Sequence, residues 1–379
     1  MDQKKSDLMI KLASPDIRDE DIERVVEVLQ NGDLVQGAYV KKLEDQVTEY
    51  TGTPYCSLVS SGTAALHLSL TALGIGRGDA VIVSAFTFPA TANVVEVTGA
   101  EVVLCDVDLQ SYVVNPGTLE QTIEQNKTKN LKAVIIVHEF GYPAEIKEIS
   151  GICKNHGLFL IEDAACAFGT IADEHHPGFY SDMACYSFHP RKAITTGEGG
   201  AVVSTNNGLI KKVNCLKNHG IEYTGKIMDF IAAGLNYRMT DFQAALAIGQ
   251  LKRFDDELEK RIILADLYSS LLKDQNKISL PKHHTNHSWQ SFMIILNKET
   301  DRMELIGKLA QNGIQTNLGA QAINCLRYYK NQYNFNENTA PNASLLFTKG
   351  LVLPLYGKLN QKDICFISEK LLGIINSIL

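Results

Sequence analysis

The sequence predicts an α/β fold built around a mostly parallel sheet, and three observations lead to this prediction. Short apolar runs rich in β-branched residues occur at residues 80–84, 102–105, 133–137, 158–161, 183–188 and 201–204. Most of these runs are separated by stretches with helical spacing. Beyond residue 251 the composition changes to a charged segment and a different pattern. Apolar strands that alternate with helices are typical of a parallel sheet covered on both faces.

The chain opens with two predicted helices. In residues 15–31 the apolar side chains Ile22, Val25, Val26 and Leu29 follow the i, i+3, i+4, i+7 spacing of an amphipathic helix. Gly32 supplies a C-terminal cap. A second helix follows the turn-rich GDLVQG and reaches Tyr50.

The predicted strands are connected by further helices at residues 63–73, 90–97, 118–125 and 146–155. After them, residues 251–272 predict one long connecting helix. A polar loop at 282–288, a strand at 291–296, a helix near 303–312 and a final helix after Lys362 follow. Because 379 residues exceed the size of most single cores, we expect two domains, at residues 1–250 and 251–379, the second a smaller α+β unit.

Composition excludes several classes of function. Hydrophobic residues make up 45% and charged residues 21% of the chain, and the formal net charge is -7. We therefore expect no nucleic-acid partner and no binding to anionic lipid. The N-terminus lacks the apolar core of a signal peptide, and no later run approaches the length of a membrane span. The eight cysteines include no C-x-x-C pair, so we expect reduced, buried thiols in a cytoplasmic protein.

Residues 60–66, SSGTAAL, form the first candidate site. Small residues at a loop-to-helix junction leave backbone N–H groups free, and the helix dipole favours an anion there. Taken alone, the motif is more often an ordinary helix cap than a phosphate site.

The second candidate is Asp163, in the sequence IEDAA directly after an apolar strand. The carboxyl ends of parallel strands are where α/β proteins bind ligands, and small neighbours leave room for a flat one. The alternative is an aspartate that caps a helix.

The third candidate is Lys192, which lies between a strand and the Gly-rich turn TTGEGG. Such a lysine is usually a surface charge. Its neighbours here are apolar or small, and Ser187 lies close by, so we expect burial to lower the pKa of Lys192 toward that of a Schiff-base amine.

Two competing motifs fail because of their context. GIGRGD at residues 74–79 follows a helix and precedes a strand, which is the reverse of a dinucleotide-binding loop. His283, His284 and His287 lie in a polar segment without the glutamate of a zinc hydrolase, so no metal site is expected.

Taken together, the chain resembles the PLP-dependent nucleotide-sugar aminotransferases, the DegT/DnrJ/EryC1/StrS family of the aspartate aminotransferase fold (fold type I). The resemblance covers nearly the whole chain. It is carried by the ordered motifs LVQGAYVKKLE, SSGTAALHL, SAFTFPATANVV, VHEFGYPAEI, IEDAACAFGT, YSFHPRKAITTGEGGAVVST, GLNYRMTDFQAALAIGQL and LVLPLYGKL. It implies a large domain with a mostly parallel seven-stranded sheet and a smaller C-terminal domain.

The resemblance also implies roles for individual residues. Lys192 matches the Schiff-base lysine that later carries the proton, and Asp163 matches the partner of the pyridine nitrogen. Phe88 matches the aromatic residue stacked on the ring. The implied phosphate contacts are Gly62, Thr63, Ser187 and, from the neighbouring subunit of a homodimer, Asn236. His189 and Tyr328 are candidates for binding the substrate.

Cys166 departs from the family pattern. The family usually has glutamine or histidine here, bonded to the ring oxygen of the cofactor, and a thiol is a weaker hydrogen-bond partner. Either the electronics of the site differ, or a neighbouring group takes over. Lys192 itself argues against the dehydratase branch of the family, in which histidine replaces the lysine.

The implied activity is transfer of an amino group from L-glutamate to a nucleotide-linked keto-deoxy sugar. TTGEGG slightly favours a 4-keto-6-deoxyhexose over a C3 ketone. An aminotransferase for another cyclic ketone, such as a keto-inositol, remains an alternative. A non-catalytic PLP-binding regulator is a weaker one, because Lys192 and Asp163 are both present.

Overall fold

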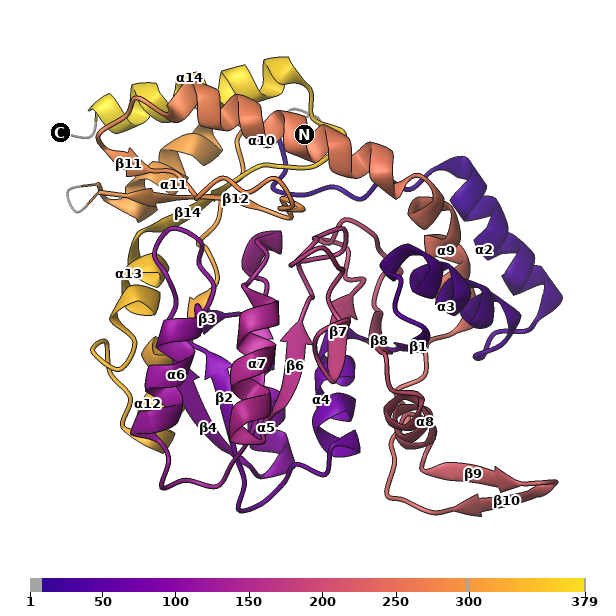
Figure 1. Ribbon diagram of the computed structural model, residues 1–379. Coiled ribbons are helices and arrows are strands. Elements are labelled where there is room, and N and C mark those ends of the chain that lie inside the picture. Colours follow the sequence, from indigo (N-terminus) through magenta and orange to yellow (C-terminus); the bar gives the residue numbers. More distant parts are fainter. Residues whose placement is uncertain (1–8, 298–299, 378–379) are drawn as a thin grey trace.

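The central element is a seven-stranded sheet with the strand order β1-β8-β7-β6-β5-β2-β4, seen in a computed structural model that describes residues 9–297 and 300–377 (Figure 1). The five neighbouring strands β7, β6, β5, β2 and β4 pair in parallel, and β8 runs antiparallel to both β7 and β1. The strands are β1 Tyr55–Val59, β2 Ala80–Ser84, β4 Glu101–Cys105, β5 Leu131–Val137, β6 Phe159–Asp163, β7 Met183–Ser187 and β8 Gly200–Ser204. All six predicted strands are confirmed, and the short apolar segment before SSGTAAL adds β1.

Helices cover both faces of this sheet, as the buried strands predict. Alternate residues of one strand enter different cores: Val81 packs with α4, α5 and α8, whereas Ile82 packs with α6 and α7. The helices are α4 Gly62–Ala72, α5 Ala90–Thr98, α6 Pro116–Gln125, α7 Ile146–His156 and α8 Asn207–Leu216. The carboxyl ends of the parallel strands all open at one edge, toward the C-terminal part of the chain (Figure 1).

The first two helices of the described residues are α2 Asp19–Asn31 and α3 Ala38–Thr51. The predicted start of α2 at residue 15 is wrong, because Arg18 and Asp21 form the capping interaction that begins the helix at Asp19. Gly32 ends it in the left-handed conformation at φ 81°. The predicted apolar face is real, but the chain leaves it uncovered: Ile22 is 51% and Leu29 53% exposed.

A β-hairpin that the sequence did not predict projects from the body of the molecule (Figure 1). It consists of β9 Ile221–Thr224 and β10 Ile227–Phe230. Every residue of β10 is exposed, including Ile227, Met228 and Phe230.

The predicted long helix at residues 251–272 is confirmed as α10 Phe254–Leu272, which begins three residues later than predicted, and a separate helix, α9 Asp241–Lys252, precedes it. The break falls at Arg253, whose guanidinium group turns back to Asp16 and Asp21 at the start of α2. A three-stranded antiparallel sheet follows, with α10, α11 Arg302–Gln311 and α14 Gln361–Ser377 packed against its core. Its strands are β11 Ile278–Ser279, β12 Phe292–Leu296 and β14 Gly350–Leu353.

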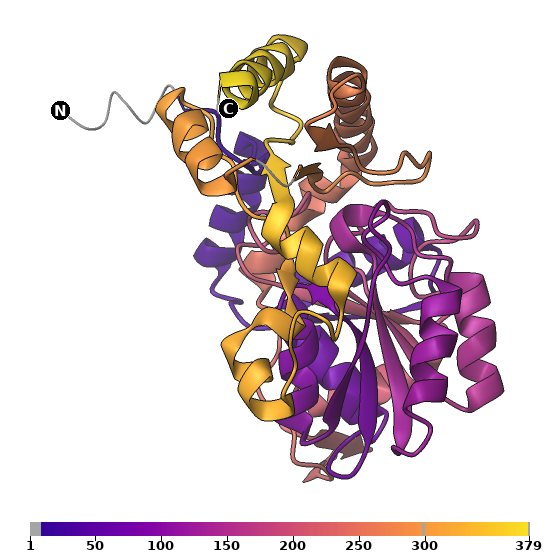
Figure 2. The same cartoon turned by 90° about the vertical axis from the view of Figure 1, so that its left-hand side faces the viewer.

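Between these elements the chain returns to the large sheet. β13 Gln321–Ala322 pairs with β3 Phe86–Thr87. The 3₁₀ helix η2 Ile323–Cys325, α12 Arg327–Tyr333 and α13 Pro341–Lys349 then contribute side chains to the two cores of that sheet, and Figure 2 shows α13 descending beside it. The division at residue 250 therefore stays a prediction of domain limits, with residues 321–349 packed on the first part.

The segment before α2 also joins both parts. Ile10 forms a parallel bridge with Ile314 and packs against the core of the three-stranded sheet, while Leu12 packs against a core of the large sheet. The absence of a signal peptide stays an expectation, since residues 1–8 lie outside the described range.

Four of the eight cysteines are not buried as predicted. Cys56, Cys105, Cys153 and Cys185 are buried, whereas Cys166, Cys215 and Cys325 are partly accessible and Cys365 is exposed on α14. All eight are free thiols. Within the described ranges, the helices are all too short or too polar to span a membrane.

Candidate active site

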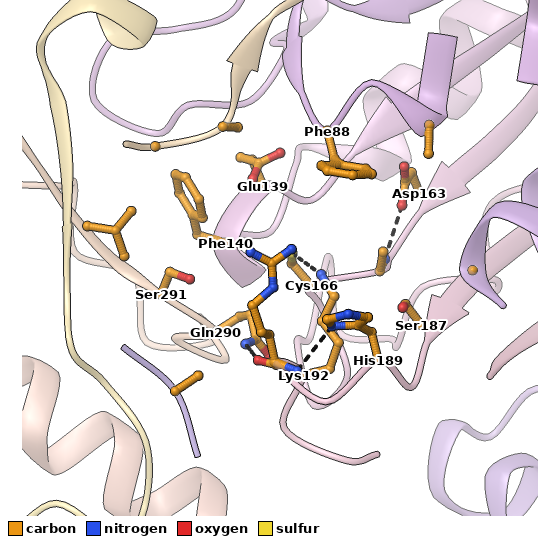
Figure 3. A pocket seen from close by; sticks show the side chains of 18 of the residues that line it. Phe88, Glu139, Phe140, Asp163, Cys166, Ser187, His189, Lys192, Gln290 and Ser291 are labelled. Carbon is orange, nitrogen blue, oxygen red and sulfur yellow. Dashed lines mark hydrogen bonds between the residues drawn. The ribbon is translucent and has the colours of Figure 1, made fainter. Parts of the chain in front are cut away.

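A cavity of about 420 Å³ lies at the carboxyl ends of β5, β6 and β7 (Figure 3). Residues from the large sheet form its floor, and the N-terminal segment and the C-terminal part complete its walls. Eight of the ten predicted site residues line it: Gly62, Thr63, Phe88, Asp163, Cys166, Ser187, His189 and Lys192.

The N-terminus of α4 forms one side of the cavity. Ser61 caps the helix by accepting a hydrogen bond from the N–H of Ala64 at 3.0 Å. A Cβ atom on Gly62 would lie only 2.9 Å from the Cβ of Ser187, so glycine allows the helix to approach the end of β7. First-turn N–H groups and the Ser187 hydroxyl are thereby brought together, which is the arrangement that binds phosphate.

Asp163 ends β6 and is 5% exposed. Its Oδ2 accepts a hydrogen bond from Thr91 Oγ1 at 2.7 Å, and its Oδ1 accepts one from the N–H of Ala165 at 3.1 Å. Burial raises the pKa of this carboxyl group, although both hydrogen bonds and the charge of Lys192 act in the opposite direction. A cationic ring nitrogen beside Asp163 would compensate for that burial.

A buried polar pair, His138 and Glu162, links the carboxyl ends of β5 and β6 next to Asp163. His138 Nε2 lies 2.7 Å from Glu162 Oε2, and His138 Nδ1 accepts from the N–H of Ala144. The other oxygen of Glu162 accepts from Ser181 Oγ and from the N–H of Gly178. His138 therefore supports the site without lining it.

Lys192 lies in the loop after β7, and its Nζ donates to Cys166 Sγ at 2.9 Å. The predicted lowering of its pKa is wrong. Burial does lower the pKa of Lys192, but Cys166, Glu139 and Asp163 together outweigh burial and raise it. Burial also raises the pKa of the Cys166 thiol.

Gln290, from the C-terminal part, holds the Lys192 loop on both sides of the lysine. Its Oε1 accepts from the N–H of Ala193 at 3.1 Å, and its Nε2 donates to the carbonyl of Arg191 at 2.6 Å. The next residue, Ser291, also lines the cavity. The lysine is therefore positioned by contacts from both parts of the chain.

Phe88 and His189 border the cavity on different elements. Phe88 precedes α5 and is 64% exposed, with its ring forming a flat wall (Figure 3). His189 accepts from the N–H of Arg191 through Nδ1, and burial lowers its pKa.

The remaining two predicted residues lie outside the cavity of their own chain. Asn236 is exposed, after the β9–β10 hairpin, where it pairs with Asn218. Tyr328 lies on α12, and its hydroxyl donates to Glu96 Oε2 at 2.8 Å. Their assigned roles stay predictions.

The structure also adds residues that the sequence did not single out: Leu12, Ala13, Glu139, Gln290, Ser291 and Asn317. For Glu139 a signal was available. It follows the apolar strand β5 as Asp163 ends β6, and the rule that singled out Asp163 applies to it equally. No local pattern marks the others, because the fold brings them in from distant segments.

These residues fit pyridoxal phosphate. The cavity combines a buried carboxyl group, a primary amine, a flat aromatic wall and an anion-binding helix N-terminus that only glycine allows so close.

Comparisons with known proteins agree with this geometry. The model of the DegT/DnrJ/EryC1/StrS aminotransferase family matches residues 15–372. The GDP-perosamine synthase of Escherichia coli O157:H7 is 32% identical over 336 residues, covering 89% of this chain and 90% of the relative. The spore coat polysaccharide biosynthesis protein SpsC of Bacillus subtilis strain 168 is 32% identical over 376 residues, covering 95% and 96%.

Among solved structures, the Streptococcus pneumoniae protein Spr1654 in its PLP form superposes with a TM-score of 0.90 at 28% identity, covering 98% of this chain and 100% of that one. The fold expected from the resemblance is thereby confirmed. The chain belongs to the DegT/DnrJ/EryC1/StrS aminotransferase family and is a PLP-dependent sugar aminotransferase.

Proposed function

We propose that the protein transfers an amino group from L-glutamate to a keto-deoxy sugar linked to a nucleotide, with a 4-keto-6-deoxyhexose as the preferred class. The observation that carries the proposal is the placement of Lys192 and Asp163 in one cavity with the N-terminus of α4. The name of the E. coli relative, which refers to a GDP-linked product, supports a nucleotide-bound acceptor.

Each residue has a distinct task in this proposal. The bound cofactor supplies an electron sink for the carbon that loses its proton. Asp163 keeps the ring nitrogen protonated, and the N-terminus of α4 with Ser187 holds the phosphate. Phe88 fixes the plane of the ring. Lys192 Nζ would take the proton from the donor's α-carbon and deliver it to the cofactor carbon on the other side of the donor's nitrogen, which requires an amine that is free to move within the cavity.

We further propose that the active unit is a homodimer in which Asn236 completes the phosphate site of the partner. Asn236 lies outside its own cavity, next to a hairpin that projects from the molecule. The exposed apolar residues of that hairpin and of α2 are the surfaces that a second copy would cover.

The test is the visible absorbance of the protein reconstituted with PLP, recorded before and after addition of L-glutamate. Wild type should show the yellow band of the lysine-bound cofactor, and glutamate should convert it to the band of the amine form. Lys192→Ala and the matched variant Lys192→Arg, which keeps the charge, should show neither the yellow band of the lysine-bound cofactor nor its conversion by glutamate.

A wild-type protein without the yellow band would overturn the assignment of Lys192. A band that glutamate leaves unchanged would refute glutamate as the donor. When glutamate converts the band, nucleotide-linked keto sugars are added to the amine form. Return of the yellow band with a 4-keto sugar, and not with a keto-inositol, would support the proposed acceptor.

A further inference from the structure

Glu139 is a second carboxyl group in the cavity. It begins the 3₁₀ helix η1 Glu139–Gly141 at the carboxyl end of β5. The turn is tightly constrained, with Phe140 at φ 56° and Gly141 at φ 92°. Glu139 is 5% exposed, and its carboxyl group lies beside Phe88 and Phe140 at the cavity wall (Figure 3).

This carboxyl group has no side-chain partner among the described residues. No side-chain hydrogen bond or ion pair reaches it, and the backbone N–H of Phe140 is its only hydrogen-bond contact. The titratable groups that face it are Lys192, Asp163 and Cys166. Because a buried carboxyl group is stabilised by hydrogen bonds and this one lines the cavity, a group that enters the cavity can become its partner.

The arrangement of the site identifies that group. Pyridoxal phosphate carries its phosphate arm and its ring oxygen on opposite edges, between the ring nitrogen and the reactive carbon. Asp163 and Lys192 mark the two ends of the ring, and Ser187 lies on the phosphate edge. Cys166 and Glu139 lie on the opposite side of the line from Asp163 to Lys192 (Figure 3). The ring oxygen therefore faces Cys166 and Glu139.

Cys166 alone is a poor partner for that oxygen. A thiol donates only weak hydrogen bonds, and this one is already in contact with Lys192 Nζ. Glu139 is better suited, because burial raises its pKa to about 8, with Asp163 adding to the rise and Lys192 opposing it. At neutral pH the carboxyl group thus retains a proton that it can donate.

We propose that the Glu139 carboxyl group donates a hydrogen bond to the ring oxygen of pyridoxal phosphate, in place of the glutamine or histidine that Cys166 replaces. The proposal rests on the cofactor site argued above. It makes Glu139 a cofactor-contacting residue that tunes the lysine-bound form of the cofactor, since a donor on the ring oxygen favours loss of the neighbouring imine proton.

The test is the pH midpoint of the absorbance change of the lysine-bound cofactor, measured without substrate. Glu139→Leu removes the donor and should raise the midpoint by about one to two pH units, the effect of one hydrogen bond to a charged group. Glu139→Gln keeps an N–H donor and should shift the midpoint by less than half as much. Glu198→Gln is the matched control, because this carboxyl group also lines the cavity but is 65% exposed.

The outcomes separate this proposal from the proposed function. An unchanged midpoint in Glu139→Leu, with the yellow band intact, would refute the role of Glu139 and leave the cofactor site standing. A midpoint that falls in both Glu139 variants would show an ionised carboxylate that repels the oxygen, which also refutes it. A wild type without the band would refute the cofactor site itself.

Discussion

The uncovered apolar face of α2 yields a quantitative prediction about assembly. Full burial of a leucine or isoleucine side chain contributes about 1.5–3 kcal/mol. Ile22 and Leu29 are each about half exposed, so covering the remainder contributes about 1 kcal/mol per side chain. A two-fold symmetric dimer contains four such side chains, which together contribute about 4 kcal/mol.

The double variant Ile22→Glu/Leu29→Glu should therefore weaken the dimer about a thousandfold. The dissociation constant is measured by sedimentation equilibrium of the PLP-loaded protein over a dilution series. Met303→Glu is the control, because Met303 is 65% exposed on α11, in the C-terminal part of the chain. Equal dissociation constants for wild type and the double variant would refute the assignment of α2 to the interface, and a monomeric wild type would refute the dimer.

Two further predictions concern residues from the C-terminal part of the chain. Gln290→Ala removes both hydrogen bonds that hold the Lys192 loop. At about 0.5–1.5 kcal/mol each, the rate of cofactor conversion by saturating glutamate should fall roughly 5- to 150-fold in stopped-flow absorbance. An unchanged rate would show that the loop holds its position without Gln290. His287 is stacked on Trp289, and burial lowers its pKa to about 3. In the unfolded state this histidine binds a proton near pH 6.5, whereas in the folded state it stays neutral there. Stability should be fully present above pH 6.5 and decline by about 1.4 kcal/mol per unit as pH falls toward 3. His287→Gln should flatten this dependence in urea unfolding between pH 7 and pH 5, and an equal slope in the variant would contradict the assignment.

The strands were predictable because each is a short, mostly buried apolar run whose signal does not depend on its neighbours. β2 was predicted with both of its ends correct. The β9–β10 hairpin was missed because its residues are exposed, so burial imposes no pattern on its sequence. The break at Arg253 was missed for another reason. The charged residues on both sides of Arg253 favour a continuous helix. The helix is interrupted because Arg253 binds Asp16, which lies 237 positions away in the sequence and gives no local signal.

The same distinction between local signals and contacts between distant residues applies to the active site. Asp163 and Lys192 could be identified because one ends a strand of the sheet and the other lies in the loop after a strand, and the resemblance gave them roles. The pKa of Lys192 could not be predicted, since its direction depends on Cys166 and Glu139, which only the fold brings beside it. The helical period of α2 likewise indicated an apolar face without indicating what covers it.

The segment at the start of the chain imposes an order on the assembly of the site. Leu12 and Ala13 line the cavity, and their position depends on the bridge between Ile10 and Ile314. During synthesis the large sheet can form as its strands leave the ribosome, but this wall must wait until about 300 further residues have been made. The nascent protein therefore holds an incomplete, open cofactor site from the time β8 has been made until Ile314 has been made, and the cavity closes only when the segment before α2 reaches Ile314.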